Sequence, residues 1–177
     1  MMEQGAKDPA LVGAFLKTLN RVLIESTGFA KPLVAAQNGH TVAGGFILAA
    51  CMDYRLMRAD RGFIRLPEVQ INIPFWPGMT ALFQAILTPQ TLRTMFLTGE
   101  RFSSQQALEM GAVDELCDAE KLLPRAIELA EMLGRSESAT YATVKRGMRA
   151  HVLRVMREED PAEIDAFVGR INLARTH

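Results

Sequence analysis

The sequence KPLVAAQNGHTVAGGFILAACMDYRLMR, residues 31–58, decides the fold. An apolar, β-prone run at residues 32–36 meets an Asn-Gly turn pair, and an apolar segment follows at residues 46–52. This order predicts a strand, a glycine-bearing turn, a buried helix and a second strand at residues 53–58. A strand, a helix and a strand in succession are typical of a right-handed parallel crossover, so we expect an α/β fold.

Two glycines, Gly44 and Gly45, follow Ala43 at the start of the predicted helix. Glycine lets a ligand approach the backbone closely, and the unpaired N–H groups of a first helical turn favour negative charge. This interpretation predicts a place for an oxyanion. The alternative is that the glycines only allow the helix to pack tightly on the sheet, and the spacing alone does not decide between the two.

The chain begins with a predicted helix, because Asp8 is a suitable N-cap, Pro9 suits the first helical position and apolar residues recur at helical spacing up to about residue 25. Residues 62–65 are predicted to form a third short strand. Beyond them the pattern is mostly helical, with a charged stretch at residues 157–160 that is typical of a solvated turn. Helices are predicted at residues 77–87, 89–97, 103–110, 118–133 and 138–156 and from residue 161 onward, and a short strand at residues 112–117.

No linker rich in Gly, Pro or Ser divides the chain, so we expect one continuous unit with an α/β core at residues 1–118 and a helical region at residues 119–177. Twenty basic residues balance twenty acidic ones, which gives no electrostatic footprint for nucleic acid or a membrane surface. The start, MMEQGAKDP, shows no signal pattern, and no apolar run reaches membrane-span length. Cys51 and Cys117 lie in apolar segments, as reduced core residues of a cytoplasmic protein do, and no metal-ligand spacing is present.

Four segments, in this order and spacing, carry a resemblance: KPLVAAQNGHTVAGGF, ACMDYRLM, LPEVQINIPFWPG and FLTGERFSSQQALEMGAVDEL. Together they resemble the enoyl-CoA hydratase/isomerase (crotonase) family over roughly residues 31–149. The resemblance implies a crotonase-like (ClpP/crotonase) core of repeated ββα units with a helical C-terminal region. It also implies an acyl-CoA substrate, no cofactor other than the coenzyme A of the substrate, and a homotrimer or hexamer.

Glu68, within LPEVQINIPF, matches a catalytic glutamate of this family, and the N–H of Gly44 matches an oxyanion donor to the thioester oxygen. An apolar pocket raises the pKa of a carboxyl group toward the working pH, which suits a group that must both take and give a proton. The alternative from the residues alone is that Glu68 lies in a surface loop, since a glutamate is seldom buried without a partner.

The second glutamate of hydratases falls three residues after Gly44 in the family, where this chain has Ile47. Because Ile47 neither accepts nor donates a proton, the resemblance favours an enoyl-CoA isomerase with Glu68 as a single proton shuttle, and hydratase activity ranks below it. Ala43, Gly45 and Ile47 are expected beside the substrate. Phe75 and Trp76 are candidate walls of the acyl pocket, although a role as ordinary core aromatics is an equal alternative.

Four other polar residues are interpreted as structural. His40 has no Ser and Asp or metal partner at a recognisable spacing, so a turn or packing role is expected. Asp53 and Arg55 are expected to pair with each other or with the backbone, and Asp114 is expected to be structural rather than a reserve acid.

Members of the family usually carry about eighty further residues before the helix at Asp8, including a motif of the FSxGxDL type that supplies the second oxyanion N–H. Nothing like it occurs here. The chain is therefore expected to be a fragment, a mis-started reading frame or a naturally short protein. Beside the isomerase hypothesis stands a second one, a truncated member that is weak or inert as a catalyst and acts in assembly or acyl-CoA binding.

Overall fold

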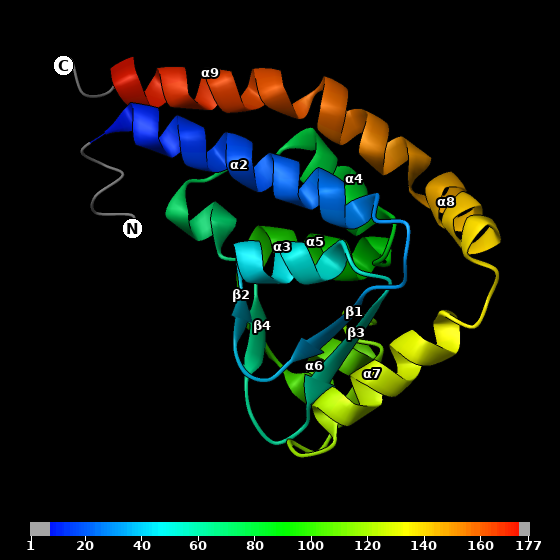
Figure 1. The fold of residues 1–177 in the computed structure, drawn as a ribbon. Coiled ribbons are helices and arrows are strands. Elements are labelled where there is room, and N and C mark those ends of the chain that lie inside the picture. Colours follow the sequence, from blue (N-terminus) through cyan, green and yellow to red (C-terminus); the bar gives the residue numbers. More distant parts are fainter. Residues whose placement is uncertain (1–7, 174–177) are drawn as a thin grey trace.

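The computed structural model describes residues 8–173 (Figure 1). Residues 1–7, where the sequence shows no signal pattern, and residues 174–177 lie outside the described part. Within residues 8–173, no helix combines the length and the apolar character needed to cross a bilayer.

The first sheet is parallel and confirms the predicted crossover. Its order is β1 (Val34–Gln37), β3 (Tyr54–Arg58) and β6 (Glu115–Cys117), and the buried helix α3 (Gly44–Ala50) connects β1 to β3. The strand predicted at residues 112–117 forms over its last three residues. A single β-α-β connection therefore leads from the first strand into the centre of this sheet.

The second sheet is smaller and carries the site described below. Strand β4 (Phe63–Arg65) lies in its centre, parallel to β2 (Thr41–Val42) and antiparallel to β5 (Arg101–Ser103). The sequence pattern predicts β4 but neither of the strands beside it. Strands of two and three residues are too short to show the alternation by which strands are recognised.

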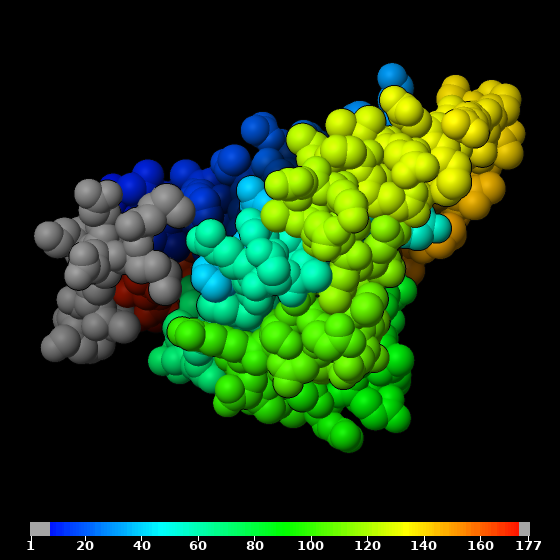
Figure 2. Space-filling model, turned by 90° about the horizontal axis from the view of Figure 1, so that it is seen from below, coloured from blue at the N-terminus to red at the C-terminus, as the bar shows by residue number. Residues whose placement is uncertain are grey.

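Helices lie above the sheets and beside the first sheet (Figure 1). In the figure α2 and α9 lie side by side along one edge, α8 continues that layer around the right side, and α7 lies beside β1 and β3. Figure 2 views the molecule from below, where α6 and α7 form much of the light green to yellow-green surface. The helices are α2 (Pro9–Thr27), α4 (Pro77–Gln84), α5 (Pro89–Thr98), α6 (Ser104–Glu109), α7 (Leu122–Leu133), α8 (Ser138–Glu158) and α9 (Asp160–Leu173), with a 3₁₀ turn, η1 (Glu68–Ile71).

Local capping explains why α2 and α6 start where the sequence predicts, whereas α7, predicted from residue 118, begins at Leu122 without a side-chain cap. The Asp8 carboxylate accepts the N–H groups of Ala10 and Leu11 at 3.0 and 3.3 Å, which confirms it as the N-cap of α2. Ser103 and Gln106 form a capping box at the start of α6. Each cap satisfies N–H groups that a helix leaves unpaired at its first turn.

The core has two parts. The main cluster lies between α3, α4, the second sheet and the α2–α8–α9 layer, and includes Phe46, Phe83 and Met156. A smaller cluster between the first sheet and α7 is built around Leu56 and Leu129. Both cysteines are buried free thiols in these clusters, as predicted.

The solvated turn predicted at residues 157–160 is wrong at Asp160. Helix α8 continues to Glu158, α9 begins at Asp160, and the Asp160 side chain is fully buried. Its Oδ1 accepts the N–H of Gly78, at the start of α4, at 2.7 Å. The two residues are 82 positions apart in sequence, and their hydrogen bond draws the end of the charged stretch into the core. No local sequence pattern predicts such a long-range contact.

Candidate active site

The turn between β2 and α3 has an unusual backbone. Ala43 has φ 51° and ψ −125°, a combination that non-glycine residues rarely adopt. Its carbonyl oxygen accepts the N–H groups of Phe46 and Ile47 at 2.9 and 3.0 Å, and these bonds open α3. Such a conformation costs about 1–3 kcal/mol and concentrates at functional sites, so the turn itself indicates a site.

The surroundings of Gly44 and Gly45 argue against the interpretation that these glycines are needed for packing. Among residues 8–173, a Cβ placed on Gly44 would meet no atom within 4 Å, and one on Gly45 would meet only the Thr41 methyl group at 3.9 Å. Tight packing of the helix therefore does not require either glycine. The first turn of α3 instead faces open space, with N–H groups that have no acceptor within the helix.

Glu68 begins η1 and is buried, with 5% of its surface exposed, which rules out the surface-loop interpretation. Its carbonyl oxygen accepts the N–H groups of Asn72 and Ile73, and Asn72 in the left-handed conformation ends the turn. The Oε2 atom of Glu68 has no hydrogen-bond partner within residues 8–173. Burial raises the pKa of this carboxyl group, and the hydrogen bond from its own backbone N–H only partly opposes that shift.

The second sheet ties the strained turn to the glutamate. Val42 of β2 pairs with Arg65 of β4 in parallel, and the Ala43 N–H donates to the Arg65 carbonyl oxygen at 2.9 Å. Glu68 follows Arg65 by three residues. Because parallel strands end at the same edge of a sheet, the first turn of α3 and the η1 turn leave the sheet at one place.

The Arg65 side chain holds η1 against the end of α5. Its Nε donates to the Gly99 carbonyl oxygen at 2.8 Å, and its Nη2 donates to the Gln70 side chain. Gln70 in turn donates to the Thr98 carbonyl oxygen at 2.6 Å. The segment that carries Glu68 is therefore fixed on two sides.

Ile47 lies one turn into α3 and belongs to the main core cluster, with 3% of its surface exposed. The position three residues after Gly44 is thus apolar and enclosed. It supplies no second carboxylate to pair with Glu68.

The two aromatic candidates pack against other aromatic rings. Phe75 stacks on Phe96 with 3.8 Å between ring centroids, and Trp76 is buried edge-on to Phe167 at 5.3 Å. These contacts agree with ordinary core packing. A role in an acyl pocket stays a prediction for both.

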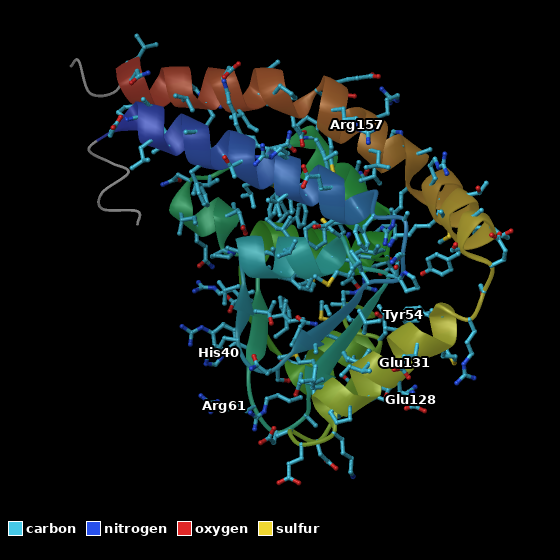
Figure 3. All side chains as sticks on the ribbon, in the orientation of Figure 1. His40, Tyr54, Arg61, Glu128, Glu131 and Arg157 are labelled. Atoms are coloured by element: carbon cyan, nitrogen blue, oxygen red, sulfur yellow. The ribbon has the colours of Figure 1, made fainter. Side chains whose placement is uncertain are left out.

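A cavity of about 280 Å³ opens along β1 and one face of α3. It is lined by all of β1, by the connection that contains His40, by Gly45 and Leu48 of α3, and by Met52, which follows that helix. His40, labelled in Figure 3 beside β2, also packs on the Phe63 ring at 4.1 Å. The packing role predicted for His40 is therefore confirmed, while its place on the cavity wall was not foreseen.

The other polar candidates serve the scaffold. Asp53 accepts the Leu33 N–H at 2.9 Å and Arg55 donates to the Ala112 carbonyl oxygen at 3.2 Å, so the expected bonds to the backbone are confirmed. Arg55 also pairs with Asp114 at 2.9 Å and Asp53 with Lys145 at 2.7 Å, so the alternative, pairing of Asp53 with Arg55, is wrong. The structural role expected for Asp114 is confirmed. Among residues 8–173, no group of three or more His, Cys, Asp or Glu side chains is arranged to hold a metal ion.

Comparison with known proteins identifies the family to which the chain belongs. The model of the enoyl-CoA hydratase/isomerase family matches residues 2–175. A carnitinyl-CoA dehydratase from Citrobacter koseri is 33% identical over 120 residues, which cover 68% of this chain and 46% of that protein. This chain therefore spans about half the length of the curated relatives it matches.

Solved structures agree on the architecture. A probable enoyl-CoA hydratase from Mycobacterium tuberculosis is 25% identical with a TM-score of 0.83, over 99% of this chain and 71% of that chain. Human mitochondrial delta3-delta2-enoyl-CoA isomerase matches with a TM-score of 0.87 at 22% identity, over 93% of this chain and 64% of its own. At that identity the second likeness concerns the fold alone.

Proposed function

Because this chain belongs to the enoyl-CoA hydratase/isomerase family, with the predicted crotonase-like fold, we propose that it moves the double bond of a 3-enoyl-CoA to the 2-position. Glu68 is the proton shuttle of this proposal, and the Gly44 N–H is a donor to the thioester oxygen. Coenzyme A enters as part of the substrate, and the reaction uses no separate cofactor.

The proposed reaction needs one base and one oxyanion site. Glu68 takes the proton from C2, and the electrons of the broken C–H bond form an enolate whose oxygen accepts the Gly44 N–H. As the enolate collapses, the double bond shifts to C2–C3 and Glu68 returns the proton to C4. A carboxyl group with a raised pKa suits both transfers, because proton transfer is most efficient when the catalytic pKa is close to the working pH.

The observation that carries the proposal is the link through Arg65. The strained turn that opens α3 follows β2, and the segment with the buried Glu68, whose Oε2 has no partner among residues 8–173, follows β4, the strand paired with β2. A donor aimed at a developing oxyanion contributes about 3 kcal/mol of transition-state stabilisation in enzymes where one has been removed, which gives a reason for a turn to keep such strain.

Hydration or dehydration is the second candidate, since the matched relatives include carnitinyl-CoA dehydratases. Hydration of a double bond is served by two carboxylates that hold and activate water. Ile47 occupies the place of the second one here, which favours the isomerisation.

A third candidate is a chain that binds acyl-CoA or takes part in assembly without turnover. The chain spans about half of its curated relatives, so the activity of the whole relatives is a proposal for this chain. We propose the homotrimer or hexamer of the family for its assembly, which light scattering tests directly.

The decisive experiment incubates the purified chain separately with a 3-enoyl-CoA, a 2-enoyl-CoA and carnitinyl-CoA, and follows each product. We expect isomerisation of the first substrate, and its loss in Glu68→Gln but not in Glu131→Gln, an exposed control on α7. Hydration or dehydration without isomerisation would replace the proposal with the second candidate. A folded chain that turns over none of the three would leave the binding role.

A further inference from the structure

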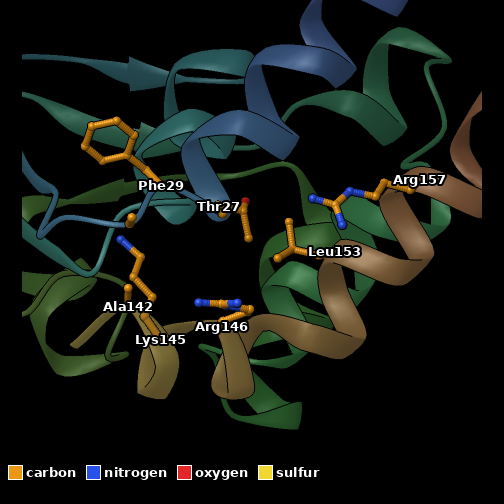
Figure 4. A pocket seen from close by; sticks show the side chains of 9 residues that line it. Thr27, Phe29, Ala142, Lys145, Arg146, Leu153 and Arg157 are labelled. Atoms are coloured by element: carbon orange, nitrogen blue, oxygen red, sulfur yellow. The ribbon is translucent and has the colours of Figure 1, made fainter. Parts of the chain in front are cut away.

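Two cavities differ in how the polar groups of their walls are satisfied. One, of about 300 Å³, lies between the end of α2 and the inner face of α8 (Figure 4). Its cations need no ligand, because Lys145 pairs with Asp53 at 2.7 Å. The two arginines of its wall, Arg146 and Arg157, are exposed to solvent. The other, the cavity along β1 and α3, contains Gln37 in its wall, and this side chain is neither paired within residues 8–173 nor exposed.

Gln37 is the last residue of β1 and is buried, with 7% of its surface exposed. Both polar atoms of its side chain, Oε1 and Nε2, lack a hydrogen-bond partner among residues 8–173. The other buried side chains of this kind in the described part of the chain, Asn20, Glu68 and Asp160, have only one such atom each. Because an unpaired buried amide is unfavourable, a folded protein keeps one where something else satisfies it.

The strand sets the direction of the Gln37 side chain. Along β1, Ala35 and Gln37 are buried and Ala36 between them is exposed, as expected when successive side chains point to opposite faces. Ala35 and Ala49 of α3 belong to the same core cluster and line the same cavity. The Gln37 side chain therefore points to the side of β1 on which α3 and the cavity lie.

The rest of the wall is uncharged. No Asp, Glu, Lys or Arg side chain of residues 8–173 lines this cavity. Leu48, Ala49 and Met52 supply apolar surface, while the other polar lining residues are exposed or half-buried, so that water reaches them; these are Asn38, His40 and Thr41. An apolar, uncharged wall with one buried amide suits a neutral hydrocarbon chain that carries one hydrogen-bonding group.

The amide limits the chemistry of that group. A carboxamide both donates and accepts hydrogen bonds, so a partner that satisfies Oε1 and Nε2 must do the same. A hydroxyl or another carboxamide does so, whereas a carboxylate only accepts and a plain hydrocarbon does neither.

The position of the cavity connects it to the substrate. Gly45, in the cavity wall, follows Gly44, whose N–H is the proposed donor to the thioester oxygen. This inference rests on the proposed function, because it takes the cavity as the place of the acyl chain. We propose that Gln37 determines specificity, and that the preferred acyl chain carries a hydroxyl or carboxamide group that pairs with the Gln37 side chain.

An ordered water molecule is the rival explanation. Buried waters pair with polar groups that are otherwise unsatisfied, and one such water would complete the bonds of Gln37 without any substrate. In that case Gln37 would give no preference between polar and plain acyl chains.

The test measures the affinity of saturated thioesters, which contain no double bond to move, by isothermal titration calorimetry. It compares octanoyl-CoA with its derivatives hydroxylated at carbons 6, 7 and 8 and with an eight-carbon chain that ends in a carboxamide. We expect at least one polar chain to bind about tenfold more tightly than octanoyl-CoA. Gln37→Leu, or Gln37→Met as a second apolar variant, should remove this preference and leave the affinity for octanoyl-CoA and for free coenzyme A unchanged. Gln84→Leu, an exposed position at the end of α4, is the matched control.

Three results would overturn the proposal. The first is a wild-type chain that binds octanoyl-CoA at least as well as every polar chain, which is also what the water explanation predicts. The second is a Gln37→Leu variant that keeps the preference. The third is an equal weakening of free coenzyme A and of all thioesters in that variant, which would place Gln37 beside the coenzyme A part. Binding without preference leaves the proposed isomerisation intact, whereas preference without turnover of a 3-enoyl-CoA refutes the isomerisation alone.

Discussion

At the start of α3, Gly44 has open space around it, whereas at the start of α4, Gly78 is enclosed. A Cβ on Gly78 would lie 2.5 Å from Asp160 Oδ2 and 2.8 Å from the Met156 Cα, closer than real contacts allow. The Gly78 N–H donates to Asp160, while the geometry of α3 leaves the Gly44 N–H free of a helical acceptor. One glycine admits a neighbouring helix and the other leaves room for a ligand.

Each of these regions also contains a buried carboxyl group with one oxygen that has no hydrogen-bond partner in the described part of the chain, Glu68 near α3 and Asp160 at α4. Burial is the main cause that raises the pKa of both. The two carboxyl groups thus have similar electrostatics but different roles, since Glu68 is the proposed base and Asp160 is structural. The two carboxyl groups differ in one contact. Asp160 accepts a hydrogen bond from the Gly78 N–H, and this bond holds the start of α4 to the start of α9.

The largest expected effect separates the two carboxyl groups by activity. Glu68→Gln should lower isomerase turnover about 10²–10⁴-fold, because the amide cannot shuttle a proton, and should leave acyl-CoA affinity nearly unchanged. Asp160→Asn should leave turnover near wild type. Steady-state kinetics with a binding titration checks both, and normal turnover with lost binding in Glu68→Gln would mean that Glu68 is not the base.

The next effect separates the two glycines by activity. Gly44→Ala should fold as well as wild type, since the added methyl group meets nothing, yet it should lower turnover about 10²-fold by displacing the substrate from the N–H groups. Turnover and melting temperature measured on the same sample test this. A variant with unchanged turnover would place the oxyanion elsewhere.

The third effect concerns the stability of the fold rather than turnover. Gly78→Ala should destabilise the fold by about 1–3 kcal/mol, because the methyl group overlaps Asp160 and the backbone of α8. In a chain of this size that corresponds to a melting temperature lower by about 2–4 °C for each kcal/mol. Denaturant unfolding of the two glycine variants measures this difference. If Gly44→Ala were the less stable variant, the contrast between an open Gly44 and an enclosed Gly78 would be wrong.

The last effect concerns pH and is confined to a narrow pH range. Burial, with the nearby charges of Glu159 and Glu163, raises the pKa of Asp160 to about 6, although the Gly78 N–H opposes this. Because the folded state holds this proton more tightly than the unfolded state does, the contribution of Asp160 to stability is largest below about pH 4 and is lost as the pH rises through 6. Each unit of difference between the two pKa values is worth about 1.4 kcal/mol.

Asp160→Asn imitates the protonated acid, so its stability relative to wild type should increase between about pH 4 and pH 7. Urea unfolding of both proteins across this range measures the difference directly. A difference that stays constant with pH would mean that Asp160 does not titrate in this window.

Short-range chemistry made much of the fold predictable from sequence. Asp8 with Pro9, and Ser103 with Gln106, mark helix starts because caps act within three residues. The crossover from β1 to β3 follows from apolar runs and their order. Strands β2 and β5 were missed, since pairing with β4 rather than any pattern of their own makes them strands.

The candidate site, like the fold, was predictable from the sequence only in part. The sequence alone determined the chemical groups: an apolar setting for Glu68, two glycines at a helix start, and an isoleucine in place of a second carboxylate. Only the tertiary structure decided that Gly44 is open while Gly78 is packed, that Arg65 joins the strained turn to Glu68, and that Asp160 is buried. The physical reason is that exposure and pairing depend on neighbours distant in the chain, whereas propensity and capping depend on residues a few positions away.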